Sequence, residues 1–156
     1  MNILTAGTET PEVNDALAKW AAVRIWGEEG AFGPPYTTMG IYDEETLVAV
    51  LVYHNYYKRY GTIEMSGAAD TPQWLTRPVL WNIFAYPFLQ LGCQMVTMRN
   101  DPADRALQRI LKSIGFESIR VPNMRGRGKD EMFHMLTDEA WGQSRFTRRM
   151  AERKAA

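Results

Sequence analysis

The sequence contains little of the chemistry that metal sites and disulfides require. It has one cysteine, Cys93, and two histidines, His54 and His134, among 156 residues. A single thiol forms no internal disulfide, and it cannot supply the paired thiolates of a structural zinc site. Two histidines leave little for a histidine-rich metal centre. We therefore expect no metal site, and the cysteine content is typical of a reducing compartment.

Long apolar runs are also missing. The longest ones, residues 47–53 and 79–91, are too short or too interrupted to span a bilayer, which needs roughly 20 apolar residues. The first residues, Met1-Asn2-Ile3-Leu4, lack the basic segment that opens a secretory signal. These features favour a cytoplasmic protein without a membrane partner.

Net charge is absent overall, although charge is unevenly distributed along the chain. The 18 basic and 18 acidic residues cancel, which argues against nucleic-acid binding through bulk charge. From residue 120 to the end, nine basic residues outnumber five acidic ones. This excess is compatible with an anionic partner or with a solvated charged helix. Residues 138–156 are expected to form a basic C-terminal helix or tail.

Size and composition indicate one globular domain over residues 1–156. Hydrophobic residues make up 46% of the chain and charged residues 23%, as in a folded soluble domain and unlike a disordered tail. A chain of this length buries about 68–70% of its unfolded surface when it folds, but it is too short for a second full domain.

Hydrophobic periodicity and turn residues predict alternating helices and strands. Helices are expected over 11–25, 74–91 and 105–114, and strands over 36–42, 46–53, 60–68, 94–98, 116–121 and 131–136. Pro87 should kink or end the second helix, and the strand at 94–98 should be buried on both faces. Ile63 and Met65 should point to one face of their strand and Glu64 to the other. The order predicts a mixed sheet with helices on both faces, an α/β or α+β fold.

Helix starts are marked by capping residues. Thr10 can cap the first helix, whose apolar spacing places Val13 and Leu17 on the buried face. Asp101 can cap the helix that ends at residue 114, with Asp104 as an acid in its first turn.

Three short motifs occur in this order of elements. They are Gly61-Thr62-Ile63-Glu64-Met65-Ser66 on a strand, Trp74-Leu75-Thr76-Arg77 opening a helix, and Ile110-Leu111-Lys112-Ser113-Ile114-Gly115-Phe116 between a helix and a strand. Together they resemble the GNAT acyl-CoA N-acyltransferases over residues 36–136. With Tyr86-Pro87-Phe88, the chain looks like the ribosomal-protein and small-molecule acetyltransferase branch, especially its short phage-encoded members.

The resemblance implies a fold and a reaction. The fold is a mixed, mostly antiparallel sheet of about six to seven strands with helices on both faces. The reaction is direct transfer of an acetyl group from acetyl-CoA, as cosubstrate, to a primary amine in a ternary complex. The amine-bearing acceptor, a small molecule or a protein, is left open.

The segment 70–77 is the candidate cradle for the pyrophosphate of acetyl-CoA. A loop that enters a helix offers unpaired N–H groups and the positive end of the helix dipole. Arg77 could form a charge-assisted pair with a phosphate, and the Thr76 hydroxyl could donate a hydrogen bond. Trp74 and Leu75, from the same motif, complete this part of the candidate cofactor site.

Small residues on the preceding strand suit the pantetheine arm. Gly67 and Ala68 would let the arm run beside the strand backbone, much as an added strand does. Asp104 occupies the position where the family often has an asparagine that contacts the end of pantetheine. An ionised aspartate can accept a hydrogen bond there but cannot donate one, and as a first-turn acid it could equally serve the helix.

Three residues are candidates for catalysis. Transfer to an amine needs a base, and Glu64 lies on the central strand where the family's base often resides. His54 follows the strand 46–53 in an aromatic setting and could bind or deprotonate a substrate. Ser66, on the same face as Glu64, completes the set. Each could also be structural: Glu64 a solvated strand residue, and His54 a hydrogen-bonded loop residue.

Other reactive side chains fit structural roles better. His134 lies inside the last expected strand, where packing is the favoured role. Cys93 has no neighbouring histidine in sequence to activate it as a nucleophile.

The sequence departs from the family at two points. Residues 70–76 have none of the glycines of the usual phosphate loop, and the helix 105–114 has no tyrosine to protonate the leaving thiolate. A GNAT-shaped module that binds a protein without catalysis is therefore an alternative.

Loops over the sheet should select the acceptor. The loops at 27–35, 55–59 and 122–129 mix aromatic and basic residues. Such a surface could receive a peptide, stack on a nucleobase or form a homodimer face. A protein that modifies or binds nucleic acid is thus a second alternative.

Overall fold

Seven strands form one sheet in the computed structural model, which describes residues 1–156 throughout. They are β1 (Asn2–Ala6), β2 (Thr37–Asp43), β3 (Thr46–Tyr57), β4 (Thr62–Ala69), β5 (Met95–Asn100), β6 (Glu117–Gly126) and β7 (Lys129–Thr137). The order across the sheet is β1-β2-β3-β4-β5-β7-β6, and only the β4–β5 pair is parallel. The predicted fold class, a mixed and mostly antiparallel sheet, is confirmed.

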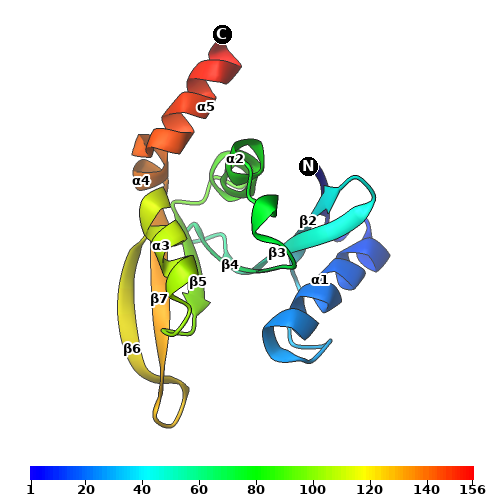
Figure 1. Ribbon diagram of the computed structural model, residues 1–156, viewed down its shortest axis with the longest axis vertical. Coiled ribbons are helices and arrows are strands. Elements are labelled where there is room, and N and C mark those ends of the chain that lie inside the picture. The colour runs from blue at the N-terminus through cyan, green and yellow to red at the C-terminus, as the bar shows by residue number, and fades with distance from the viewer.

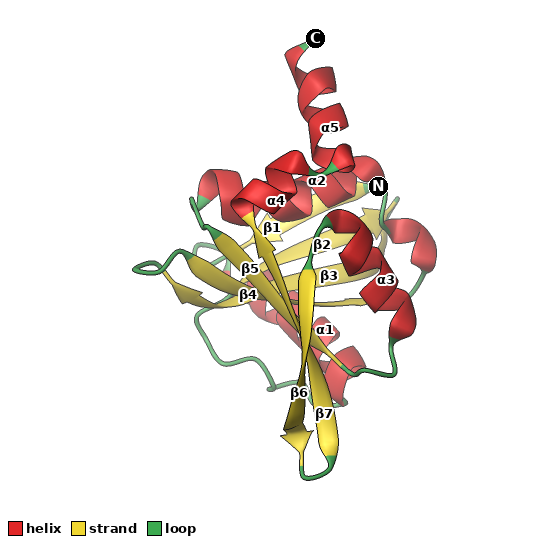
Figure 2. Cartoon of the chain, turned by 90° about the vertical axis from the view of Figure 1, so that its left-hand side faces the viewer, coloured by secondary structure: helices red, strands yellow, loops and turns green.

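Helices cover both faces of the sheet. They are α1 (Pro11–Trp26), α2 (Arg77–Ala85), α3 (Arg105–Ile114), α4 (Asp138–Gln143) and α5 (Arg145–Ala155), with a short 3-10 turn η1 (Pro72–Trp74) and a π turn η2 (Tyr86–Gln90). α1 lies on one face, and α2, α3 and α4 lie toward the other (Figure 2). α5 projects away from the body of the molecule (Figure 1).

None of these helices is both long enough and apolar enough to cross a membrane.

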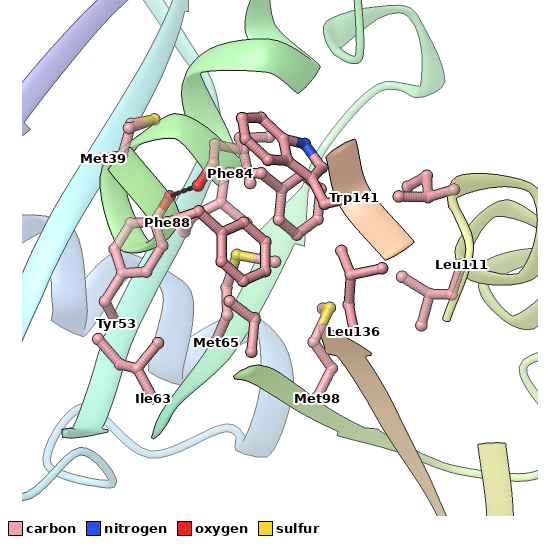
Figure 3. Close-up of a cluster of buried hydrophobic side chains, with 14 of the residues drawn as sticks. Met39, Tyr53, Ile63, Met65, Phe84, Phe88, Met98, Leu111, Leu136 and Trp141 are labelled. Atoms are coloured by element: carbon pink, nitrogen blue, oxygen red, sulfur yellow. Dashed lines mark hydrogen bonds between the residues drawn. The ribbon is translucent and has the colours of Figure 1, made fainter. Parts of the chain in front are cut away.

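Two hydrophobic cores sandwich the sheet. The larger core joins the sheet to α2, α3 and α4 and includes Phe84, Leu136 and Trp141 (Figure 3). The smaller core packs α1 against Val50 and Val52. Alternation along β4 follows from this layering: Ile63 and Met65 enter the larger core and Glu64 faces the α1 side, as predicted.

Pro87 ends α2, as the sequence predicted, and the chain continues as the π turn η2. Proline lacks the N–H that would ordinarily donate to the carbonyl of Ile83, four residues earlier. The hydroxyl of fully buried Tyr53, on β3, donates to that carbonyl at 2.7 Å instead (Figure 3). The Tyr53 hydroxyl thus supplies the hydrogen bond to the Ile83 carbonyl that Pro87 cannot donate.

Buried His134 joins three strands. Its Nδ1 lies 2.6 Å from Ser118 Oγ on β6, and its Nε2 lies 2.7 Å from Asn100 Oδ1 on β5. His134 is fully buried, as the packing role predicted, but it also completes a hydrogen-bond chain. Burial lowers the pKa of His134, against a smaller opposing effect of Glu131, so the ring is neutral near pH 7.

Several predicted boundaries are wrong. β1 was missed, because as an edge strand it buries only Ala6 and carries little hydrophobic signal. β3 runs on to Tyr57 through a bulge, so residues 55–57 are strand and not turn. β6 and β7 likewise extend through most of the expected loop at 122–129. α2 begins at Arg77 and not at residue 74.

Two burial predictions also need correction. β5 is not buried on both faces: Val96 and Met98 are buried, whereas Thr97 between them is half-buried and Arg99 is exposed. Val13 of α1 is exposed, because the buried stripe of α1 begins one position later, at Asn14, and continues through Leu17 and the alanines at 18, 21 and 22. Leu17 lies on that buried stripe, as expected.

Of the two capping predictions, the one for Thr10 is right in position only, and the one for Asp101 is wrong. Thr10 occupies the N-cap of α1, although its hydroxyl bonds to Gly7 and not to the first helical turn. Asp101 does not cap α3. Asp104 takes that place, and its Oδ1 accepts from the Leu107 N–H at 3.1 Å.

Tyr53→Phe should lower the free energy of unfolding by about 1–3 kcal/mol, because it leaves the buried Ile83 carbonyl without its donor. Tyr86→Phe is the matched control, since Tyr86 packs on the Tyr53 ring but its hydroxyl makes no hydrogen bond within the chain. Urea unfolding of both variants measures the difference. Equal stability of the two would contradict this role for Tyr53.

Stability should also fall as the pH drops below about 6.5, the ordinary pKa of histidine. The pKa of His134 is lowered in the folded chain, so the unfolded chain binds the proton more readily at acid pH. His134→Gln can keep both hydrogen bonds but carries no titratable proton. Its unfolding free energy, followed by urea titration above and below this pH, should depend less on pH than that of the wild type. An unchanged dependence would exclude His134 as its source.

Candidate active site

The two parallel strands at the centre of the sheet separate soon after they meet. β4 and β5 pair at only three positions: Thr62 with Met95, Ile63 with Val96, and Glu64 with Thr97. Beyond Glu64, β4 follows β3 and β5 follows β7. The β4 edge over residues 65–69 therefore has no strand partner on its β5 side, and its backbone can accept an added strand-like ligand.

Two cavities open where the strands separate. An apolar cavity of about 490 Å³ lies on the α2 and α3 side, and a polar cavity of about 270 Å³ lies on the α1 side. Gly67, Met98, Asp104 and Leu107 line both. The cavities thus meet at the free edge of β4.

The apolar cavity gathers five of the seven predicted cofactor residues. It is lined by Gly67, Ala68, Trp74, Leu75 and Asp104. At Gly67 the absence of a side chain keeps the cavity wall open, since a Cβ built there would come within 2.8 Å of Leu51 Cδ1.

The other two predicted cofactor residues lie at the start of α2, outside the lining of this cavity. Thr76 is the N-cap, and its Oγ1 accepts from the Val79 N–H at 3.4 Å. Arg77 faces α5.

The three predicted catalytic residues do come together beside the polar cavity. His54 Nε2 lies 2.8 Å from Ser66 Oγ and 3.7 Å from Glu64 Oε2. Glu64 Oε1 accepts from Asn55 Nδ2 at 3.2 Å. At the bulge in β3, Asn55 takes a left-handed conformation, with φ of 49°, directly after His54, which is the register partner of Glu64. Glu64 and Ser66 line the cavity, while His54 stands behind them against Phe32.

The electrostatics of this cluster favour proton acceptance. Burial lowers the pKa of His54; Glu64 opposes the shift and Arg99 adds to it. His54 is therefore neutral near pH 7 and can accept a proton at a ring nitrogen. The neutral imidazole thus lies within reach of both the Ser66 hydroxyl and the Glu64 carboxylate, and this cluster can remove a proton from a group in the cavity.

The opposite wall is an ion-pair network that the sequence did not reveal. Buried Glu131 on β7 lies 2.8 Å from Arg125 Nη1 and 3.8 Å from Arg99 Nη2. Arg125 Nε also lies 4.0 Å from Asp101. These residues come from β5, the following loop and the β6–β7 hairpin, and strand pairing alone places them together.

The charges lining the polar cavity sum to a negative value. Its carboxylates are Glu64, Asp101, Asp104 and Glu131, and its guanidiniums are Arg99 and Arg125. Four negative charges against two positive ones leave a formal excess of two negative charges, which favours a cationic ligand.

Cys93 lies outside both cavities. The thiol is buried, and burial raises its pKa, so it stays protonated and unreactive.

No family model matches the chain, and no curated protein matches it. Solved structures do. A variant of the spermidine N-acetyltransferase of Vibrio cholerae superposes with a TM-score of 0.67 at 9% identity, over 92% of this chain and 98% of that one. A protein of T. thermophilus named as an acetyltransferase gives 0.63 at 15% identity, over 78% and 68%. The ribosomal-protein-S5-alanine acetyltransferase of Vibrio fischeri gives 0.58 at 12%, over 68% and 63%.

Identities of this size establish a shared fold and leave activity and substrate open. The sheet separates between β4 and β5, and acetyltransferase structures superpose on it. The chain therefore has the fold of the GNAT acetyltransferases, which its sequence motifs predicted.

Proposed function

We propose that the protein is an N-acetyltransferase that transfers an acetyl group from acetyl-CoA to a primary amine. The observation that carries this proposal is the free edge of β4, which lies between an apolar and a polar cavity. Such an arrangement lets a thioester and an amine approach one another from opposite faces of the sheet, in a ternary complex.

The apolar cavity suits the pantetheine arm. Amide groups of the arm can pair with the unpaired backbone of β4 beside Gly67 and Ala68, while Trp74 and Leu75 cover its apolar atoms. The start of α2, next along the chain, offers the Arg77 N–H and the positive end of the helix dipole to the pyrophosphate, since Pro78 has no N–H and Thr76 Oγ1 caps the Val79 N–H. Arg77 can add a charge-assisted contact.

Acetyl-CoA supplies the acetyl group as a thioester. The proton of the attacking amine passes directly to Glu64, or through the Ser66 hydroxyl to neutral His54. Free N–H groups of the β4 edge stabilise the charge that develops on the carbonyl oxygen. The nitrogen–carbon bond forms, the carbon–sulfur bond breaks, and solvent protonates the thiolate, because α3 has no tyrosine for this role.

The acceptor is proposed to be a cationic amine. The net negative charge of the polar cavity supports this, and the Trp26 ring at its rim can bind an ammonium group through a cation–π contact. The structural neighbours acetylate spermidine and an alanine of ribosomal protein S5, so a small amine and a protein are both compatible. A homodimer through exposed aromatics such as Tyr57 and Tyr60 stays a prediction.

Glu64→Gln should lower kcat/KM with an amine acceptor by about 10²–10⁴-fold, the usual contribution of a general base. Acetyl-CoA affinity, measured by calorimetric titration, should be unchanged. Glu45→Gln, in the β2–β3 turn and remote from both cavities, is the matched control. Release of CoA from acetyl-CoA over a panel of amines gives the rates. If acetyl-CoA does not bind the wild type even at millimolar concentration, the chain is not an acetyltransferase.

Gly67→Val should weaken acetyl-CoA binding at least about tenfold, because overpacking a filled site costs about 1–3 kcal/mol. Its new side chain would collide with Leu51 and occupy the wall that both cavities share. Gly30→Val is the control, since nothing lies within 4 Å of a Cβ at Gly30. Calorimetry with CoA and acetyl-CoA measures the change. Normal affinity in Gly67→Val would place the cofactor elsewhere.

A further inference from the structure

α5 contacts the body of the molecule through one short face. The Ser144 Oγ caps it by accepting from the Thr147 N–H at 3.2 Å. Phe146, Thr147 and Met150 pack toward α2, where they share a small cavity with Trp81. Residues 151–156 are exposed and extend beyond the sheet (Figures 1 and 2).

Three arginines meet where α5 passes α2. Arg77 from α2 and Arg149 and Arg153 from α5 line an open depression of about 450 Å³. Arg149 and Arg153 are four residues apart and so lie on one side of the helix. No ion pair within the chain neutralises any of the three. Glu152 is the one acidic side chain of the lining, against three guanidinium groups.

The depression lies next to the end of the proposed cofactor cavity. Leu80 lines both the apolar cavity and the small cavity under α5, and Arg77 lines both that small cavity and the depression. The path from the apolar cavity to the three arginines therefore follows the first turns of α2. Trp74 and Leu75, just before that helix, belong to the apolar cavity.

We propose that Arg149 and Arg153 of α5, together with Arg77, bind the phosphate groups of the nucleotide end of CoA. The inference rests on the proposed function. The loop at residues 70–76 has no glycine to bring its backbone close to a phosphate. Guanidinium groups donate paired hydrogen bonds to phosphate oxygens and can replace such backbone donors. The C-terminal helix thereby becomes part of the cofactor site.

The test compares two double variants of the same helix. Arg149→Ala with Arg153→Ala removes the arginines of the depression, and Arg145→Ala with Arg148→Ala removes two others that do not line it. Both lose the same net charge. Thermal unfolding of each establishes that the fold is retained. Calorimetric titration then measures the affinity for CoA and for CoA without its 3′-phosphate.

We expect the first double variant to bind CoA at least about tenfold more weakly than the wild type, from the loss of charge-assisted hydrogen bonds. The control pair should bind as the wild type does. Removing the 3′-phosphate should weaken binding to the wild type but matter less to the first variant. Glu152→Gln should have the opposite effect and tighten binding, because it removes the one acid of the depression.

Two results would overturn the inference while leaving the proposed function intact: equal affinity of the first double variant and the wild type, or equal weakening by both pairs. A DNA mobility shift abolished by the first variant, with CoA binding unaffected, would instead assign the arginines to nucleic acid. Failure of the wild type to bind CoA or acetyl-CoA would contradict the proposed function itself.

Discussion

The short parallel junction between β4 and β5 is the constraint on which the site depends. Two antiparallel halves, β1 to β4 and β5 to β7, are joined by three residue pairs. The junction is fixed at its start, where the Gly61 carbonyl accepts from the Gln94 and Met95 N–H groups. Each half then keeps its own hydrogen-bond ladder, so the halves diverge and leave backbone groups without a strand partner only along the facing edges of β4 and β5.

Alternation along β4 turns that divergence into a two-sided site. Ile63 and Met65 anchor the larger core, while Glu64 and Ser66 face the polar cavity. Gly67 follows them and lines both cavities, because a larger residue would meet Leu51. One strand therefore supplies the core contacts, the proposed base and the opening between the cavities.

Opposite charges occupy the two ends of the proposed reaction path. The polar cavity carries an excess of negative charge around Glu64, and its arginines are engaged by Glu131 and Asp101. The depression beside α5 carries unpaired arginines. A cationic amine would thus be attracted to the polar cavity and repelled by the depression. The phosphate groups of CoA would be attracted to the depression and repelled by the polar cavity.

The sequence by itself determined the local features: the order of most elements, the end of α2 at Pro87, the faces of Ile63 and Glu64, and the motifs that predicted the fold. These follow from periodicity, proline geometry and short-range spacing. The sequence did not predict β1, because an edge strand with one buried residue has almost no hydrophobic periodicity.

Only the tertiary structure decided how the site is assembled. The meeting of Glu64, His54 and Ser66 depends on the β3–β4 register and its bulge. The Glu131 network depends on pairing between β5, β6 and β7, and the cluster of Arg77 with α5 depends on packing of two helices remote in sequence. Such contacts join residues that are far apart in the sequence, so no local pattern predicts them. Strand register and helix packing depend on the packing of the whole core.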